Sequence, residues 1–531
     1  MFKHLKRIFT YTKLNAINQN LNNEKQNSKK DNKIPKSINK IKDMLEERFS
    51  ECSDFVIREL LIGKDGSTQV VIAYIDGMVN KQLINSDILK PIMIESDFIN
   101  LNQSSKGKST LSLFKEKLIC TSDIQEENSF DESISSILSG DTMIFMDDCD
   151  SALKVSLRYW DKRSVEEPAT DAVIRGPREG FTETLRTNTT LLRRKIKNTK
   201  LKFETMKVGE HTNTDVCICY IKGIANNEVI KMVKERIGRI KTDAILDSGY
   251  IEEFIQDSKL GLFPTVGNSE KPDIVAGKIL EGRVAILCDG TPFVLTVPYL
   301  FVEAIQSSED YYTRSIYATM SRFVRLMALV ITIFLPALYV ALVTFHHDII
   351  PYKLLLTMTA AREGIPFSAL TEALIMVITF ELLREAGIRM PRAIGQAVSI
   401  VGALVIGDAA VKAGLVSTPM VIVIAVTAIS SFIVSSIAGT LLFMRVVLML
   451  AGNIIGILGI LLVFVAFFIH MCKLKSFGVN YLTPFTPLSG SDLKDAFVRV
   501  PLWAMFTRPK ELTWEHGGNA KFKNRHKKEG R

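Results

Sequence analysis

The stretch ITFELLREAGIRMPRAIGQAVSIVGALVIGDAAVKAGLVS, residues 378–417, alternates apolar runs with charged side chains and decides how the second half of the chain folds. Its apolar runs are typical of membrane helices, where an ionisable group is costly unless it faces a bundle interior or a water-filled cavity. We therefore expect the charges in and around this stretch to be buried between helices and to be functional. They are Glu372, Glu381, Arg384, Asp408, Lys412 and Arg445.

Apolar segments on both sides of this stretch predict an all-α membrane bundle over residues 322–470. The segment 326–345 holds twenty residues without a charge, enough to cross a hydrocarbon core of about 30 Å. Pro336 lies within it and is tolerated in a membrane helix. The further candidate segments are 366–383, 393–411, 416–439 and 446–469.

The distribution of Lys and Arg predicts the topology of this bundle. Basic residues near membrane segments favour the cytoplasmic side, and both flanks of the bundle are basic. Two cytoplasmic flanks require an even number of crossings, whereas the candidate segments number five. We therefore expect four full spans, and we assign 366–383, which contains Glu372 and Glu381, to a re-entrant or interior-facing segment.

The spacing of the charges predicts two ion pairs within single helices. Glu381 and Arg384 are three residues apart and Asp408 and Lys412 are four apart, so each pair meets on one helix face. One interpretation is that such pairs only neutralise each other. The alternative is that Glu372 and Glu381 form rings of carboxylates between subunits, which would select cations and make these two glutamates the candidate ion pathway.

Small residues at a spacing of four predict close packing of the membrane helices. The pattern occurs at Ala403-xxx-Gly407, Ala410-xxx-Gly414 and Gly452-xxx-Gly456. We expect the packing positions to be Gly407, Gly414, Gly452 and Gly456.

The first half of the chain contains an internal repeat. VVIAYIDGMVNKQLI (70–84) aligns without gaps with VCICYIKGIANNEVI (216–230), and GDTMIFMDD (140–148) resembles GRVAILCDG (282–290). Each pair of segments has the pattern of buried strands, with turn and helix signals between them. We therefore expect two related α/β subdomains, the first at 48–165 and the second, with a linker helix, at 166–310.

The linker VIRGPREGFTETLRTNTTLLRRKIKN (173–198) predicts a helix whose last turns are basic. One interpretation is a capped surface helix, and the alternative is a contact surface for a neighbouring subunit or lipid headgroups. The candidate domain-interface motif precedes this helix and consists of Gly176, Pro177, Arg178, Glu179, Gly180 and Phe181.

The ends of the chain carry much of its formal net charge of +9. Residues 1–45 predict a disordered basic arm, because they offer little apolar surface, and residues 471–531 predict a basic cytoplasmic tail. The first residues have no secretory signal pattern. The fold class is therefore α+β, a cytoplasmic region of two related α/β subdomains followed by an all-α multipass membrane bundle.

Motifs for catalysis and cofactors are weak. The seven cysteines form no repeated CxxC spacing, which argues against a zinc site or a disulfide framework. KGKST (106–110) lacks the first glycine of a phosphate loop. We expect no enzymatic activity, cofactor, metal or nucleic-acid partner.

Two long motifs resemble the GerA family, the A subunits of spore germinant receptors. They are GIPFSALTEALIMVITFELLREAGIRMPRAIGQAVSIVGALVIGDAAVKAGLVS (364–417) and GPREGFTETLRTN (176–188), the latter followed by Arg193 and Arg194. The resemblance implies a multipass protein of the spore inner membrane, with its amino-terminal domain and carboxyl tail on the side of the spore core.

The resemblance further implies the partners and the activity. A subunits of this family work with a permease-like B subunit and a lipoprotein C subunit, and are thought to oligomerise into a ligand-gated channel for monovalent cations. The leading hypothesis is therefore a receptor subunit that triggers germination as an oligomeric cation channel. The alternatives are a signalling scaffold without conductance and, more weakly, a stand-alone transporter.

Overall fold

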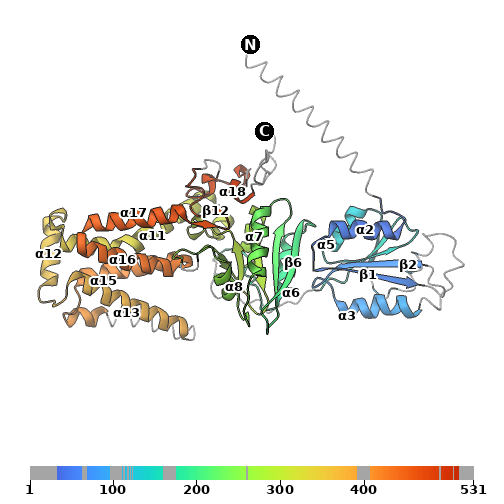
Figure 1. Ribbon diagram of the computed structural model, residues 1–531, viewed down its shortest axis with the longest axis horizontal. Helices are drawn as coiled ribbons and strands as arrows, with labels where there is room; N and C mark the ends of the chain where they lie inside the picture. The colour runs from blue at the N-terminus through green and yellow to red at the C-terminus, as the bar shows by residue number, and fades with distance from the viewer. Residues whose placement is uncertain are drawn as a thin grey trace, which may run out of the picture.

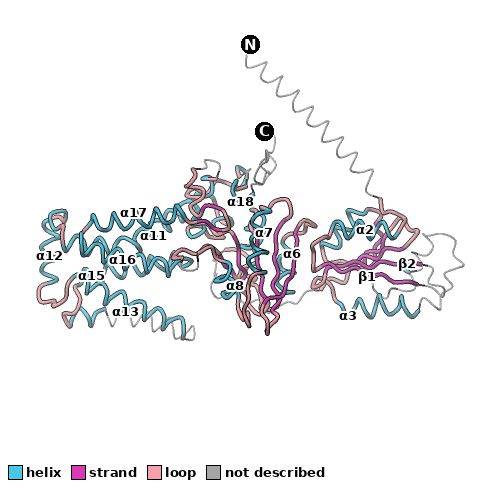
Figure 2. The backbone as a smooth tube through the Cα atoms, viewed as in Figure 1, coloured by secondary structure: helices cyan, strands magenta, loops and turns pink. Residues whose placement is uncertain are grey.

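The protein is elongated, with two β-sheets and a helical bundle arranged in line (Figure 1). The strands of the two large sheets lie in one part of the molecule and the long helices in another (Figure 2). The computed structural model describes residues 33–62, 68–95, 111, 114–115, 119, 121, 123–159, 175–258, 261–390, 407–488, 492–505 and 508–513. Most of the predicted arm, the KGKST segment and residues 514–531 lie outside the described residues.

The first sheet is antiparallel and has the strand order β1-β2-β4-β5-β3. Its strands are β1 Phe55–Ile62, β2 Thr68–Ile75, β3 Ile124–Glu127, β4 Thr142–Met146 and β5 Ala152–Val155. Alternate residues point to opposite faces, and helices cover both. Val71 and Phe145 pack against α2 (Ile38–Arg48) and α5 (Phe130–Leu138). Ile72 and Ile144 pack against the helical segment of α3 (Lys81–Leu83), η1 (Ile84–Leu89) and η2 (Pro91–Glu95).

The second sheet has the same strand order, β6-β7-β9-β10-β8. Its strands are β6 Leu201–Val208, β7 Thr214–Ile221, β8 Gly267–Ser269, β9 Val284–Cys288 and β10 Val294–Val297. Helices α6 (Leu185–Lys195) and α9 (Pro272–Glu281) cover one face, and α7 (Asn227–Gly238) and α8 (Ser248–Ile255) cover the other. The repeated sequences therefore occupy equivalent strands, β2 with β7 and β4 with β9.

Helix α6 joins the two sheets, so its interpretation as a surface helix is wrong. Arg193 is fully buried, and its Nε and Nη2 donate to the two carboxylate oxygens of Asp54 at 2.9 and 2.8 Å. Its Nη1 donates to the carbonyls of Asn198 and Leu201 at 3.2 and 3.1 Å. A buried guanidinium is tolerated here because its donors are satisfied.

Two residues of the motif at 176–181, Glu179 and Phe181, contact α6 and the core of the second subdomain. Phe181 is buried in the core formed by α6 and α9, and Glu179 pairs with Arg194 and Lys195 at 2.8 and 3.6 Å. Its glycines, proline and Arg178 lie in the irregular segment that leads into α6. The contacts that join the two sheets include those of Arg193 and of Lys202, whose Nζ donates to the Ser50 carbonyl at 2.5 Å. Backbone hydrogen bonds join the segment at 51–53 to Phe203 as well.

The helical region is organised around α11. A short α10 (Glu309–Tyr312) precedes it, α12 lies across the bundle end farthest from the sheets, and the other long helices run along the bundle (Figure 1). The long helices are α11 Ser315–Thr344, α12 Tyr352–Arg362, α13 Ala369–Arg389, α15 Thr418–Ile433, α16 Ala438–Ile455 and α17 Ile457–Lys473.

The outer surface of the bundle is apolar, which suits lipid rather than water. By length and composition, α11 and α16 could each cross a membrane, while α15 and α17 are apolar but shorter. Large exposed side chains include Ile422, Ile429, Phe443, Ile454, Leu458, Leu461 and Phe468.

Several predicted spans have different limits in the structure. The segment 446–469 is not one span, because Gly456 separates α16 from α17 with φ +70° and ψ −146°. The segment 366–383 lies in α13, one continuous helix of 21 residues on which Glu372 is buried, as the interior-facing alternative requires. Most of the predicted span 393–411 falls at 391–406, outside the described residues. A glycine that ends one helix and begins the next within an apolar run cannot be recognised from hydropathy.

The predicted packing glycines have different roles. A Cβ on Gly452 would lie 3.1 Å from the Ala337 carbonyl, so this glycine permits close contact between α16 and α11. A Cβ on Gly407 would make an ordinary contact with Val421 at 3.7 Å. Gly414 has φ +66° and open space around it, and therefore ends a helix rather than packing against one.

The predicted basic tail is folded over residues 475–488 and 492–505. Strands β11 (Lys475–Ser476) and β12 (Val479–Asn480) form a hairpin, which is followed by the turns Leu493–Asp495 and Leu502–Ala504 and by α18 (Lys510–Thr513). Tyr481 is fully buried against Phe263, Tyr299 and Phe301. Apolar side chains among the lysines therefore fix this segment to the second sheet.

We predict that Gly456→Ala destabilises the bundle by about 1–3 kcal/mol, because a positive φ is strained for any residue with a Cβ. The added Cβ would also lie 2.5 Å from His346 Cε1. Thermal loss of helical circular dichroism, measured on the full chain in detergent, should occur at a lower temperature. Gly439→Ala in α16, where nothing lies within 4 Å, is the control and should not lower it. Equal midpoints for both variants would contradict this role.

Candidate functional site

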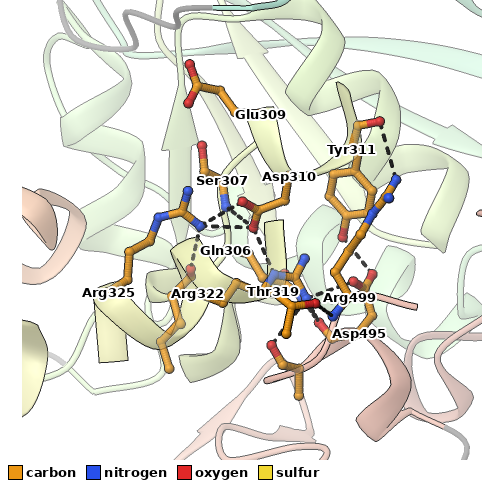
Figure 3. Close-up of polar contacts among 12 residues, drawn as sticks. Gln306, Ser307, Glu309, Asp310, Tyr311, Thr319, Arg322, Arg325, Asp495 and Arg499 are labelled. Atoms are coloured by element: carbon orange, nitrogen blue, oxygen red, sulfur yellow. Dashed lines mark hydrogen bonds and ion pairs between the residues drawn. The ribbon is translucent and has the colours of Figure 1, made fainter. Parts of the chain in front are cut away.

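A cluster of buried charges lies where the second sheet meets the first long helix (Figure 3). Asp310 and Tyr311 come from α10, Arg322 and Arg325 from α11, and Asp495 and Arg499 from the carboxyl-terminal segment. These six residues are called the junction cluster below.

Arg322 is the centre of the junction cluster. It is 1% exposed, and its Nε donates to Asp310 Oδ2 at 2.8 Å. Its Nη1 lies 2.9 Å from Asp495 Oδ1 and donates to the Asp495 carbonyl at 2.6 Å. Arg325, one turn further along α11, places Nη1 at 2.9 Å from both carboxylate oxygens of Asp310. The spacing of three residues puts both guanidinium groups on one face of the helix.

Tyr311 and Arg499 complete the cluster. Tyr311 Oη donates to Asp495 Oδ2 at 2.6 Å, and the Arg499 guanidinium lies 5.8 Å from the centre of the Tyr311 ring. Burial, followed by the charge of Asp495, raises the pKa of Tyr311 well above its usual value, so the phenol stays protonated and donates. The backbone N–H of Arg499 donates to Thr319 Oγ1 at 3.2 Å.

The cluster holds together three segments that are distant in the sequence. Burial raises the pKa of the Asp495 carboxyl, and the positive charge of Arg322 opposes that shift. Removing one partner of a buried ion pair leaves an uncompensated charge, which costs about 3–5 kcal/mol. Helix α10, the start of α11 and the carboxyl-terminal segment are therefore expected to move as one body.

A cavity of about 590 Å³ lies beside the cluster, between the second subdomain and the bundle. Asp273, Lys278 and Glu303 line one side, and Arg325 and Ser436 line the other. Lys278 Nζ and Arg283 Nη2 lie 2.8 and 3.1 Å from Glu303. Burial favours the neutral acid, but Arg283 and Lys278 lower the pKa of Glu303 below its usual range. A small polar molecule would fit this space and touch both parts of the protein.

Of the two candidate pathway residues, Glu372 is fully buried and has partners that its sequence neighbourhood did not predict. Its Oε2 accepts from the Ser417 N–H and hydroxyl at 3.0 and 2.8 Å. Its Oε1 lies 3.2 Å from Arg362 Nη2 of α12. The N–H groups at the start of α15 favour a negative charge at this position. Glu372 therefore joins α12, α13 and α15.

The ion pairs set by local spacing are present at two positions. Glu381 and Arg384 lie 2.7 Å apart on α13, and Asp408 and Lys412 also lie 2.7 Å apart, with both side chains more than half exposed. Each candidate pathway glutamate thus has an arginine beside it. In this conformation neither carboxylate is free to hold a cation.

The sequence did not single out Asp310 and Asp495 as partners of the arginines at the start of α11. Asp310 lies 12 residues before Arg322 and Asp495 173 residues after it, so only the fold brings them together. The available signal was the concentration of three arginines before the first apolar segment. No group of three or more His, Cys, Asp or Glu side chains that could hold a metal occurs among the described residues.

Comparison with known proteins assigns nearly the whole chain to one family. Residues 43–511 match the family described as Bacillus/Clostridium GerA spore germination protein. The chain is 44% identical to spore germination protein KA of Bacillus subtilis, over 87% of this chain and 84% of that protein. It is 38% identical to spore germination protein GerLA of Bacillus cereus, over 87% of this chain and 92% of that protein.

One solved structure is also similar. The crystal structure of the N-terminal domain of the A subunit of the Bacillus megaterium spore germinant receptor GerK3 is 35% identical to the chain. The match covers 51% of this chain and 97% of that one, with a TM-score of 0.41.

We predict that Asp310→Asn destabilises the full chain by about 3–5 kcal/mol, because Arg322 and Arg325 lose their shared negative partner. Thermal unfolding in detergent should show the loss. Glu235→Gln is the control, since Glu235 is half exposed and its ion pairs are local, with Lys231 in α7 and with Arg239 directly after it. The control should change stability by less than about 0.5 kcal/mol. A similar, small effect of both substitutions would contradict the role assigned to the cluster.

Proposed function

We propose, from the premise that this chain belongs to the GerA family of spore germination proteins, that it is the A subunit of a nutrient germinant receptor. The subunit lies in the spore inner membrane and acts, as an oligomer, as a ligand-gated channel for monovalent cations. A permease-like B subunit and a lipoprotein C subunit are its partners.

The junction cluster is the observation that carries this proposal. A receptor subunit must transmit a conformational change from its soluble part, or from a partner subunit, to the helices of the bundle. Arg322 and Arg325 belong to the first long helix, while Asp310 and Asp495 belong to segments that pack on the second subdomain. A ligand shifts such an equilibrium only through contacts that differ between the two states. Buried ion pairs at the junction make those contacts strong.

The arrangement of the helices supports the proposed topology. Helix α11 begins next to the second sheet, and α17 ends where the β11–β12 hairpin returns to that sheet (Figure 1). Both ends of the bundle region thus lie on the same side, which requires an even number of crossings. We place this side toward the spore core and the apolar outer surface in lipid.

The state of the two glutamates supports a closed conformation. Glu372 is neutralised by Arg362, and Glu381 by Arg384. An open state would have to separate these carboxylates from their arginines before a cation could occupy them. The alternative function, a scaffold without conductance, does not require this change.

The experiment that tests the proposal measures ion flux through the complete receptor. The chain, its B subunit and its C subunit are reconstituted into liposomes loaded with K⁺, and a defined mixture of amino acids, sugars and nucleosides is added. Release of K⁺ that depends on the mixture supports the channel. An assembled receptor that releases no K⁺ would favour the scaffold.

We further predict that Arg325→Gln lowers the release of K⁺ by about tenfold or more, because it weakens the coupling between α10 and α11. Arg314→Gln is the matched control, since Arg314 is exposed just before the same helix. Receptor assembly is checked for each variant on native gels. Equal release from both variants at equal assembly would rule out coupling through the cluster.

A further inference from the structure

Helix α12 has an apolar surface that the rest of the chain leaves uncovered. None of its 11 residues is buried. Tyr352 is 73% exposed, and Leu354 and Leu356 are each 52% exposed. Ile349 and Phe367, shortly before and after the helix, are exposed as well. Because a helix of this length is marginally stable in water without packing, and contiguous exposed apolar side chains mark a contact surface, α12 requires a surface outside this chain.

The place of α12 in the bundle favours lipid as that surface. The helix follows α11 and lies across the bundle end farthest from the sheets (Figure 1). When the long helices cross the membrane, α12 therefore lies along the membrane surface, and its apolar side chains continue the apolar outer surface of the bundle. Tyr352 is of a type enriched at this boundary. Lys353 is exposed and α12 contains no acidic residue, which suits contact with anionic headgroups.

The side of α12 that faces the bundle contributes little to the buried core. Met358 packs partly against it, and Arg362 Nη2 lies 3.2 Å from Glu372 Oε1. Arg362 Nε is buried and has no hydrogen-bond partner among the described residues. A displacement of α12 would therefore leave the apolar core of the bundle largely intact, while it would break the ion pair.

That ion pair determines the state of Glu372. Among the described residues, Arg362 is the only cation within ion-pair distance of this carboxylate. The other oxygen, Oε2, accepts from the N–H and the hydroxyl of Ser417 on a different helix start. If α12 moves away, Oε2 keeps both hydrogen bonds and Oε1 loses its cationic partner. The position of α12 thus decides whether Glu372 is neutralised.

We propose that α12 lies in the lipid headgroup region of the membrane face opposite the sheets, and that this lipid contact keeps Arg362 against Glu372. The inference rests on the proposed function, which orients the bundle across the membrane and requires Glu372 to leave its arginine in the open state. It adds a surface, the lipid, that favours the closed state through differential contact with α12.

The lipid contact is tested by fluorescence quenching in the complete receptor in liposomes. The chain carries Leu354→Trp together with Trp160→Phe, Trp503→Phe and Trp514→Phe, and it is labelled with hydroxytryptophan so that its emission is separate from that of the partner subunits. We expect lipids with a nitroxide near the headgroup to quench the fluorophore at position 354. Leu61→Trp in the same background is the control, because Leu61 is exposed on the first sheet, and it should not be quenched.

A second position keeps this test available if the first variant does not assemble. Leu356→Trp places the fluorophore two residues further along α12 and should also be quenched. An assembled receptor without quenching at these positions would overturn the inference, because α12 would then lie in water, under a partner subunit or under a second copy of the chain.

The effect on Glu372 is tested by release of K⁺ from loaded liposomes without nutrients. Leu354→Asn combined with Leu356→Asn weakens the lipid contact without changing any charge. We expect the basal release to rise by about tenfold, because separation of Arg362 from Glu372 then costs less. Leu354→Met combined with Leu356→Met keeps the apolar surface and is the control, which should leave the basal release unchanged.

The two measurements separate the inference from the function on which it rests. Quenching at α12 with unchanged basal release from the Asn variant would overturn the role of the lipid contact in closing the bundle, provided that nutrients still open the wild type. A wild-type receptor that never releases K⁺ would contradict the channel function instead, and the quenching would still show whether α12 lies in lipid.

Discussion

The pairing of Arg322 with Asp310 and Asp495 is the constraint on which the architecture depends. A guanidinium that is excluded from water must keep its anions within hydrogen-bond distance. The requirement fixes the start of α11 against α10 and brings a segment more than 170 residues later to the same place. Without it, fewer contacts would hold the hairpin and turns after residue 474 against the second sheet.

Buried arginines recur wherever two parts of this protein meet. Arg193 joins the two sheets through Asp54, Arg322 joins the second sheet to the first long helix, and Arg445 joins α16 to α11 through the Thr332 carbonyl. Arginine suits these positions because its planar group donates several hydrogen bonds in fixed directions and remains charged when buried. Each joint is therefore directional, and apolar packing surrounds it.

Features set by neighbouring residues could be predicted from the sequence, and features set by the fold could not. The repeat at 70–84 and 216–230 marked equivalent strands, and spacings of three and four residues gave the Glu381–Arg384 and Asp408–Lys412 pairs. The break at Gly456 depends on a dihedral angle that hydropathy does not register. The partners of Glu372 and Arg322 come from segments distant in the sequence, and the buried residues of 475–488 and 492–505 are hidden among basic residues in the sequence.

The elongated order of the three parts limits how strongly a distant event can influence the bundle (Figure 1). Any displacement that begins in the first sheet must cross the contacts between the sheets, which include Arg193, and then the contacts between the second sheet and the bundle, which include Arg322. These two joints are connected in series. The free energy that reaches the bundle therefore cannot exceed the free energy needed to break the contacts of the weaker joint. Strengthening only the stronger joint would leave this limit unchanged.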